Sequence, residues 1–331
     1  MEGDPAERRA AESPAREGPD ALRPPAAATT LLADHEIGTR QLGQWQIVWL
    51  RFRSHRLAVW AARFLALVIA FAIIGPTIAP HLPAVSLRSL NPYVSHDRPP
   101  RLWPFDLRTV LGVDQNGFWI SSYVLTGGRG SLVIGIGGSL LAGAIGCLIG
   151  GASGYFGGLV DAVLMRVVDA LLTVPFLPLL MVLSTYLTNR NMLVFAALFG
   201  LFGWAGIARL IRSSVLSLRE REFTEAARAL GVSDAGVILR HMLPNTLDIL
   251  AVACTLNVAV FILANAALDF VGVGSSDITW STVMNADNGD ILHVDWWIYV
   301  FPGACILLTA LSVNFVGDGL RDALDPRLNQ R

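Results

Sequence analysis

The sequence predicts an all-α membrane protein with six transmembrane helices and with both termini on the cytoplasmic side. Of its 331 residues, 53% are hydrophobic and 15% are charged, whereas a soluble domain carries about 25% charged residues. Six stretches are long and apolar enough to cross a bilayer, which takes roughly 20 residues of helix. The predicted spans are 58–80, 130–155, 167–188, 192–211, 247–273 and 296–316.

The distribution of arginine gives the orientation. All 25 basic residues are arginine, and no lysine occurs. Loops on the cytoplasmic side of a membrane protein carry an excess of basic residues. With the N-terminus inside, we count 18 arginines on the cytoplasmic side and six outside. The opposite orientation reverses this majority, so the sequence predicts that both termini are cytoplasmic.

Changes in composition divide the chain into segments. Residues 1–43 are rich in Ala, Pro, Glu and Arg, so they are predicted to be a disordered cytoplasmic tail. Residues 44–57 suit an amphipathic juxtamembrane helix with arginines toward anionic headgroups, and they equally suit a plain flank of the first span. The other predicted segments are the first transmembrane helix 58–80, an external loop 81–129, a core membrane domain 130–317 and a cytoplasmic C-terminal tail 318–331.

Several functions are excluded by what the sequence lacks. A net charge of −1 argues against a nucleic-acid partner. A P-loop needs a lysine for its phosphates, so the chain is expected to hydrolyse no ATP. Neither a bound cofactor nor catalytic residues are expected in this chain. The cysteines lie within apolar runs, as packing residues do, and no Cys/His cluster predicts a metal site. These cysteines are Cys147, Cys254 and Cys305.

The second predicted span carries a small residue at every fourth position. Small residues let two helix backbones approach closely within a membrane, where packing drives association. This face is therefore predicted to be buried against another helix, either of this chain or of a partner. Its residues are Gly138, Ala142, Gly146, Gly150 and Gly154.

Two prolines interrupt the third predicted span. Pro175 and Pro178 each remove a backbone hydrogen bond and bend a helix. The bend belongs either to a moving transport pathway or to a static kink. Near the inner end of the same span, Arg166 and Asp169 are three residues apart, so they either pair with each other or are solvated at the interface.

The loop between the fourth and fifth spans, residues 212–246, is unlike a simple connector. Its segment Glu220–Leu230 contains strong helix formers. Gly231 can adopt the left-handed conformation that ends a helix, and Ser233 suits the N-cap of a second helix. The loop is thus predicted to form two short helices joined by a glycine bend, which are either a docking surface or a solvated pair. The apolar face of the first helix is Phe223, Ala226, Ala227 and Leu230.

This loop resembles the "EAA" signature of permeases from ATP-binding-cassette importers. The matching residues are Glu225-Ala226-Ala227, then Gly231, then Leu243-Pro244. His241 and Asn245, in the form Arg-His-x-Leu-Pro-Asn, are similar to the dipeptide, oligopeptide and nickel branch. Further similarities to that branch lie in Leu111–Gly117, Ser153–Gly158, Gly203-Trp204 and Gly317–Arg327, so the resemblance covers about residues 45–328.

The resemblance implies a type I ABC importer permease fold and the C-type permease of a pair. Residues 130–317 are then the core permease domain, and 212–246 is a cytoplasmic coupling loop. The residues implied to couple this chain to an ATPase are Phe223, Glu225, Ala226, Ala227, Arg228, Gly231, His241, Pro244 and Asn245.

The resemblance also implies partners and a location. These are a paralogous second permease, two ATPase subunits that use ATP and Mg, an extracytoplasmic solute-binding protein, and the bilayer of a bacterial plasma (inner) membrane. Short peptides are the implied cargo, carried by alternating access, with nickel complexes or other small peptide-like solutes as the alternative. Two alternatives belong to other functional classes. One is an ATP-independent channel or carrier, and the other is an assembly subunit that transports nothing.

The chain departs from the branch at the end of the fifth span. Where the branch usually reads Glu-Ala-x-Leu-Ser-Phe, this chain has Asn265 and, four residues later, Asp269. An ionisable residue in or at the edge of a span is by default a functional-site hypothesis. Asn265 and Asp269 are therefore possible pathway residues, together with Pro175 and Pro178, and the alternative for Asp269 is an interfacial side chain that reaches water.

Overall fold

The structure is a computed structural model that describes residues 44–78, 111–112, 120–285 and 296–324. Contacts divide the chain into two units, residues 1–47 and Val48–Arg331, and the helices below belong to the second unit apart from the first turn of α2. The predicted disordered tail, most of the predicted external loop and the end of the C-terminal tail lie outside the described residues.

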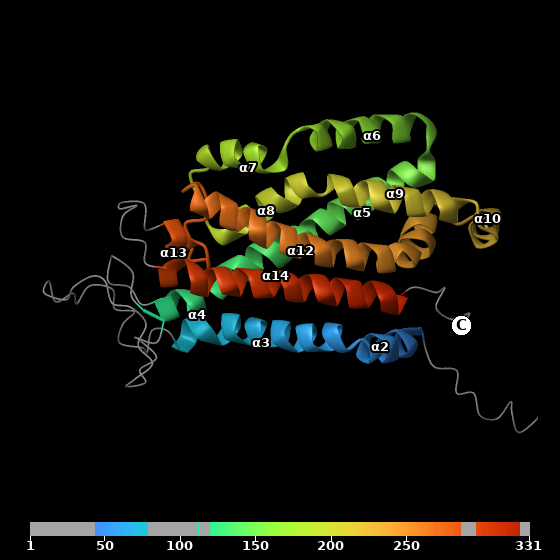
Figure 1. The fold of residues 1–331 in the computed structure, drawn as a ribbon. Helices are drawn as coiled ribbons and strands as arrows, with labels where there is room; N and C mark the ends of the chain where they lie inside the picture. Colours follow the sequence, from blue (N-terminus) through green and yellow to red (C-terminus); the bar gives the residue numbers. More distant parts are fainter. Residues whose placement is uncertain (1–43, 79–110, 113–119, 286–295, 325–331) are drawn as a thin grey trace, which may run out of the picture. The chain divides into compact units, whose positions relative to one another are not determined.

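All regular structure in the described part of the chain is helical (Figure 1). The helices that precede the loop are α2 (Gln44–Ser54), α3 (Arg56–Ile78), α4 (Ile120–Leu132), α5 (Gly138–Phe156), α6 (Gly158–Thr173), α7 (Phe176–Thr185), α8 (Met192–Gly203) and α9 (Ala205–Arg219). They are followed by α10 (Glu222–Ala229), α11 (Asp234–Gly236), α12 (Leu247–Phe270), α13 (Thr282–Asn285) and α14 (Trp296–Leu324).

Within the described residues, four helical stretches are long and apolar enough to cross a membrane, or six if each of two bent pairs is one span. The single stretches are Arg56–Thr77, Ile120–Phe156, Asp234–Phe270 and Trp296–Leu324, and the bent pairs are α6 with α7 and α8 with α9. The prediction of an all-α membrane protein is thus confirmed for the described residues.

The second predicted span begins earlier than its hydropathy indicated. A π-helical turn, Val133–Gly137, joins α4 to α5, so one continuous helix runs from Ile120 to Phe156. Part of the predicted external loop is therefore helical. The sequence of α4 contains Ser, Thr and Gly, so its hydropathy is too low for it to be recognised as part of a span. About half of its residues are nevertheless buried. Its glycines allow the backbone of the segment Thr279-Trp280 to pass very close.

The third predicted span is two helices rather than one kinked helix. The axes of α6 and α7 differ by 83° across the break at Val174-Pro175. Pro175 has an extended backbone and precedes α7, so it causes the break. Pro178 lies in the first turn of α7, where a backbone N–H has no helical partner to lose, so it adds no bend.

The fourth predicted span is also broken, which the sequence analysis did not predict. α8 and α9 differ in direction by 46° at Trp204.

The prediction of a second, separate short helix in the loop is wrong. α11 continues through a π-helical turn (Val237–Met242) and a 3₁₀ turn (Leu243–Thr246) into α12. Pro244 is tolerated because it lies at the start of the 3₁₀ turn.

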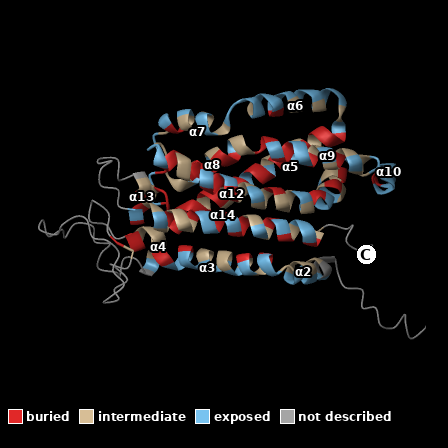
Figure 2. Ribbon diagram, viewed as in Figure 1, coloured by how far each residue is buried: buried red, intermediate tan, exposed pale blue. Residues whose placement is uncertain are grey.

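The small-residue face of α5 packs against α8 and α9 of the same chain. A methyl group at Gly146 would lie 2.8 Å from Cβ of Ile207, and one at Gly154 would lie 2.9 Å from the carbonyl oxygen of Arg212. At the other end of α5, one at Gly138 would lie 3.1 Å from Cβ of Phe199. The face is therefore buried against helices of this chain, which was one of the two alternatives that the sequence left open. Figure 2 shows the buried residues concentrated on these helices, whereas α6 is largely exposed.

Replacing Gly150 by alanine is expected to destabilise the chain by about 1–3 kcal/mol, because the new methyl group collides with the backbone carbonyl oxygen of Ala208. Gly206→Ala is the matched control, since it lies in helix α9 with nothing within 4 Å of the added methyl. Thermal unfolding of both variants in detergent measures the difference. A Gly150→Ala variant as stable as Gly206→Ala would contradict the packing described here.

Candidate functional site

The loop between α9 and α12 places α10 at one end of the molecule with most of its surface exposed. Thr224 and Ala227 form its buried side, and the Thr224 hydroxyl donates to the carbonyl oxygen of Leu218 at 2.8 Å. Phe223 and Leu230 instead point outward, with 41% and 84% of their surface exposed. Only Ala227 of the predicted apolar face is buried, so the described part of the chain leaves the rest of that face exposed.

The glycine bend forms as the sequence predicted. Gly231 has a φ of 79°. Its N–H donates to the carbonyl oxygen of Arg228 at 2.9 Å, and the N–H of Val232 donates to that of Ala227 at 3.2 Å. This pair of bonds is the Schellman motif, which ends a helix with a left-handed residue. The Ser233 hydroxyl caps the next helix by accepting from the N–H of Gly236 at 3.3 Å, so both local predictions are confirmed.

The remaining loop residues lie beside α10. The turn Val237–Met242 packs against α10, and it contains His241. The Asn245 side chain donates to the carbonyl oxygen of His241 at 2.5 Å, which secures the start of α12. Pro244 and Asn245 are exposed, as are Glu225 and Ala226. All nine predicted coupling residues therefore lie on α10 and the turns that follow it.

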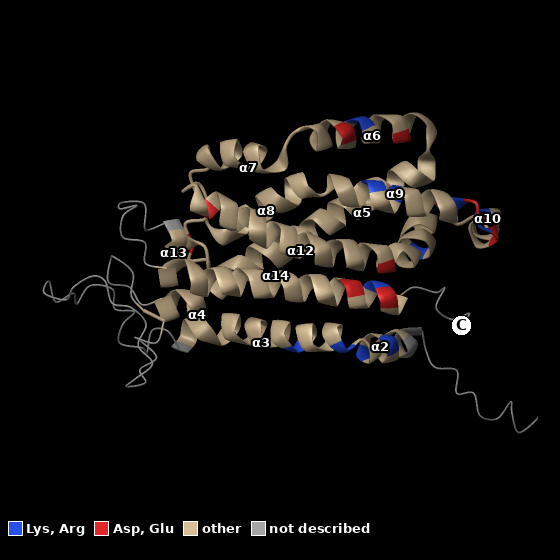
Figure 3. Ribbon diagram, viewed as in Figure 1, with Lys and Arg blue, Asp and Glu red and all other residues tan. Residues whose placement is uncertain are grey.

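Charged residues gather at this end of the second unit (Figure 3). The first turn of α10 carries Glu222 and Glu225, and its last turn carries Arg228. Each sign therefore lies at the end of the helix where the helix dipole favours it. The longest helices, by contrast, are almost free of charge along most of their length (Figure 3).

A buried carboxylate organises the opposite end of α12. Asp269 is 4% exposed. Its oxygens accept from Nδ2 of Asn265 at 2.8 Å, from the backbone N–H of Ser275 at 3.0 Å, and from the hydroxyls of Thr279 and Ser281 at 2.5 Å each. Asn265 is also buried, and its Oδ1 has no hydrogen-bond partner among the described residues. The carboxylate is thus enclosed by donors and does not reach water.

The segment that follows α12, residues 275–281, is also hydrogen-bonded to other parts of the chain. The backbone N–H of Ser276 donates to the carbonyl oxygen of Arg190 at 2.7 Å, and Asp277 accepts from the N–H of Met192 at 2.7 Å. The indole N–H of Trp280 donates to the carbonyl oxygen of Val124 at 3.0 Å. The sequence analysis missed Thr279, Trp280 and Ser281; the available signal was a run of hydroxyl residues shortly after a carboxylate in a span.

Two ion pairs join α6 to α9. Arg212 binds Asp161 through both carboxylate oxygens, at 2.5 and 2.6 Å. Arg209 binds Asp169 at 2.7 Å, with 55% of each side chain exposed. The possible pairing of Asp169 with Arg166 is therefore wrong. α9 runs beside α6 and presents Arg209 to Asp169 across the helix pair, a geometry that helical spacing along α6 alone does not reveal.

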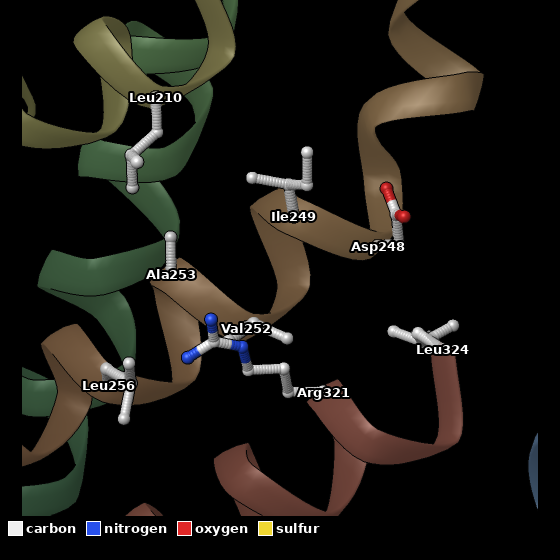
Figure 4. Close-up of a pocket in the computed structure, with 8 residues that line it drawn as sticks. All are labelled: Leu210, Asp248, Ile249, Val252, Ala253, Leu256, Arg321 and Leu324. Carbon is white, nitrogen blue, oxygen red and sulfur yellow. The ribbon is translucent and has the colours of Figure 1, made fainter. Parts of the chain in front are cut away.

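A pocket of about 390 Å³ lies between α9, α12 and α14 (Figure 4). Its walls are mostly apolar. The Arg321 side chain extends from α14 toward α12, whereas the carboxylate of Asp248 points away from Arg321. The lining residues are Leu210, Asp248, Ile249, Val252, Ala253, Leu256, Arg321 and Leu324. Among the described residues, no group of three or more His, Cys, Asp or Glu side chains could hold a metal ion.

Long apolar helices and broken spans define an integral membrane component, and a charged helix is exposed at one end of its second unit. The family model "binding-protein-dependent transport system inner membrane component" matches residues 121–330, and the model "N-terminal TM domain of oligopeptide transport permease C" matches residues 43–100. The chain belongs to the family of binding-protein-dependent transport system inner membrane components. The resemblance seen in the sequence is thereby confirmed.

Individual relatives agree with this family. The chain is 36% identical over 287 residues to the oligopeptide transport system permease protein OppC of Escherichia coli strain K12, and 37% identical to that of Salmonella typhimurium strain LT2. It is 36% identical over 288 residues to the glutathione transport system permease protein GsiD of Shigella flexneri. Each match covers 86% of this chain and 91% of the relative.

Proposed function

We propose that this permease subunit moves short peptides across the bacterial plasma membrane by alternating access, driven by a separate ATPase that docks on the loop around α10. The single observation that carries the proposal is the outward-facing apolar side of α10. Phe223, Ala226 and Leu230 are exposed at the charged end of the molecule. Apolar residues within a polar rim are typical of a protein interface.

The proposal assigns the arrangement in the membrane as well. Each bent helix pair counts as one span, which gives six, and both termini are cytoplasmic. α10 then lies on the cytoplasmic side, where ATP and Mg are available to the two ATPase subunits. A paralogous permease completes the pathway, and an extracytoplasmic binding protein delivers the solute. ATP drives the cycle because it binds one state of the assembly more tightly than another.

Short peptides are favoured as the cargo by the names of the relatives. One group is named for oligopeptide transport and another for glutathione transport, and glutathione is itself a tripeptide. A small peptide-like solute is therefore the second candidate. An ATP-independent carrier would use buried ionisable residues as relays. The buried Asp269 instead accepts hydrogen bonds from four donors. This favours an ATP-driven importer over an ATP-independent carrier.

Replacing Phe223 by aspartate is expected to remove the docked ATPase. An aromatic anchor in an interface commonly contributes 2 kcal/mol or more, so the affinity should fall by about thirtyfold. The tagged chain is purified from its own bacterial membrane, and the ATPase that copurifies is quantified. Phe223→Leu, which keeps an apolar side chain, is the control and should retain the ATPase. If Phe223→Asp carries as much ATPase as the unmodified chain, the docking proposal is lost.

A further inference from the structure

Tyr155 connects the end of α5 to the loop that carries α10. It lies in the last turn of α5 and is 5% exposed. Its hydroxyl donates to a carboxylate oxygen of Asp234 at 2.5 Å. Asp234 is the first residue of α11, directly after the Ser233 cap. A hydrogen bond to a charged acceptor is stronger than one between neutral groups, so this contact holds the far side of the glycine bend against α5.

Arg228 holds the near side of the bend against the same residue. Its Nε donates to the hydroxyl oxygen of Tyr155 at 3.3 Å, and its guanidinium lies 4.8 Å from the centre of the tyrosine ring. A cation over an aromatic face is attracted by the ring electrons. One tyrosine therefore contacts both halves of the helix–bend–helix, with Arg228 in the last turn of α10 and Asp234 at the start of α11.

The other side-chain hydrogen bond that anchors α10 is local. The Thr224 hydroxyl bonds to Leu218, six residues earlier at the end of α9. It therefore orients α10 only against α9, the helix that directly precedes it in the chain. The bonds of Arg228 and Asp234 to Tyr155 span 73 and 79 residues. Tyr155 thus gives the loop a direct connection to α5, apart from the covalent connections through α9 and α12.

The end of α5 is itself tightly held, so a displacement there cannot be absorbed locally. The Ser153 hydroxyl donates to Asp161, the carboxylate that Arg212 also binds. A methyl group at Gly154 would lie 2.9 Å from Cβ of Val215 on α9. Close-packed interiors transmit displacement rather than deform. A movement imposed on Tyr155 is therefore passed to α5, and through Ser153 and Gly154 to α6 and α9.

We propose that Tyr155 is a positioning residue that couples movement of the ATPase-docking loop to α5. The inference rests on the proposed function, because the docked ATPase supplies the movement. Tyr155 touches neither ATP nor solute. Its hydroxyl keeps α10 and α11 in register with α5, so that the loop and the small-residue core of the bundle move as one body.

The test is Tyr155→Phe in the assembled transporter, reconstituted in vesicles with its ATPase and binding protein. The variant keeps the ring that Arg228 stacks on and removes only the hydroxyl. ATPase content and basal ATP hydrolysis should stay unchanged, while tripeptide uptake per ATP hydrolysed should fall about tenfold, as expected for the loss of one charge-assisted hydrogen bond. Tyr186→Phe is the matched control, because Tyr186 is 82% exposed and lies between α7 and α8.

Two further measurements separate coupling from general destabilisation. Asp234→Ala and the double variant with Tyr155→Phe should each lower the coupling ratio no further than Tyr155→Phe alone, because all three remove the same hydrogen bond. In the isolated full chain, Tyr155→Phe should speed amide hydrogen exchange in residues 222–234 and leave α12 unchanged.

Three outcomes would overturn the coupling role of Tyr155. The first is an unchanged uptake per ATP in Tyr155→Phe, and the second is unchanged hydrogen exchange in residues 222–234. The third is an equal loss of uptake and ATP hydrolysis together with reduced assembly, which would mean that Tyr155 has a purely structural role. If the unmodified chain binds no ATPase, the proposed function fails, and the coupling role fails with it. If the unmodified chain binds the ATPase and Tyr155→Phe leaves uptake per ATP unchanged, only the coupling role fails.

Discussion

Replacing Asp269 by alanine is expected to lower the free energy of unfolding by about 3 kcal/mol or more. The side chain accepts hydrogen bonds from Asn265, Ser275, Thr279 and Ser281 in a buried site. A buried donor that loses its acceptor costs about 1–3 kcal/mol, and four donors lose their acceptor here. Thermal unfolding of the purified chain in detergent measures the effect.

The comparison with two other substitutions makes this test specific. Asp269→Asn keeps one acceptor oxygen, and the hydroxyls of Thr279 and Ser281 can turn to accept from the new amide, so its loss should be smaller than that of alanine. Asp322→Ala removes a side chain that is 62% exposed and should change stability by less than about 0.5 kcal/mol. An Asp269→Ala variant as stable as Asp322→Ala would show that the carboxylate does not organise the segment after α12.

Replacing Arg212 by alanine is expected to cost about 3 kcal/mol, far more than the same change at Arg209. Arg212 binds Asp161 through two hydrogen bonds, and the two side chains are 30% and 18% exposed. Removing one partner leaves the other charge partly buried without its counter-ion, which is strongly destabilising. The Arg209–Asp169 pair is largely solvated and should contribute less than about 1 kcal/mol.

These two arginines form a matched pair, because both lie on α9 and both bind carboxylates of α6. Thermal unfolding of Arg212→Ala, Arg209→Ala and Asp161→Ala gives the comparison. Asp161→Ala should resemble Arg212→Ala, and the double variant should be no worse than either, since the interaction is shared. Equal effects at Arg209 and Arg212 would mean that burial does not set the strength of these contacts.

The membrane class, the helical content and the loop chemistry were predictable from sequence because they depend on local properties. Hydropathy over about 20 residues sets whether a helix can span, and this identified the stretches that became α3, α12 and α14. The backbone freedom of Gly231 and the hydroxyl of Ser233 also act within a few residues of themselves. The family followed for the same reason, since its signature lies in one short segment of the loop.

Contacts between distant segments could not be predicted in this way. Helical periodicity shows which residues share a face, yet the residue that covers the face comes from elsewhere in the chain. Thus the glycine face of α5 was evident, but α8 and α9 as its neighbours were not. Asp169 pairs with Arg209, 40 residues away, rather than with Arg166.

The structure also changed the meaning of individual residues. Asp269 looked like an isolated carboxylate at a membrane boundary, and tertiary packing surrounded it with donors. Phe223 was predicted on one apolar face with Ala227, and the structure separates the two, because Thr224 and Ala227 pack inward while Phe223 is exposed. The sequence by itself determined a helical membrane permease with a loop that bends at a glycine, since both features arise from short stretches of chain. Only the tertiary structure decided which helices enclose α5, what holds Asp269 and which side of α10 is open, because each depends on which distant segments pack together.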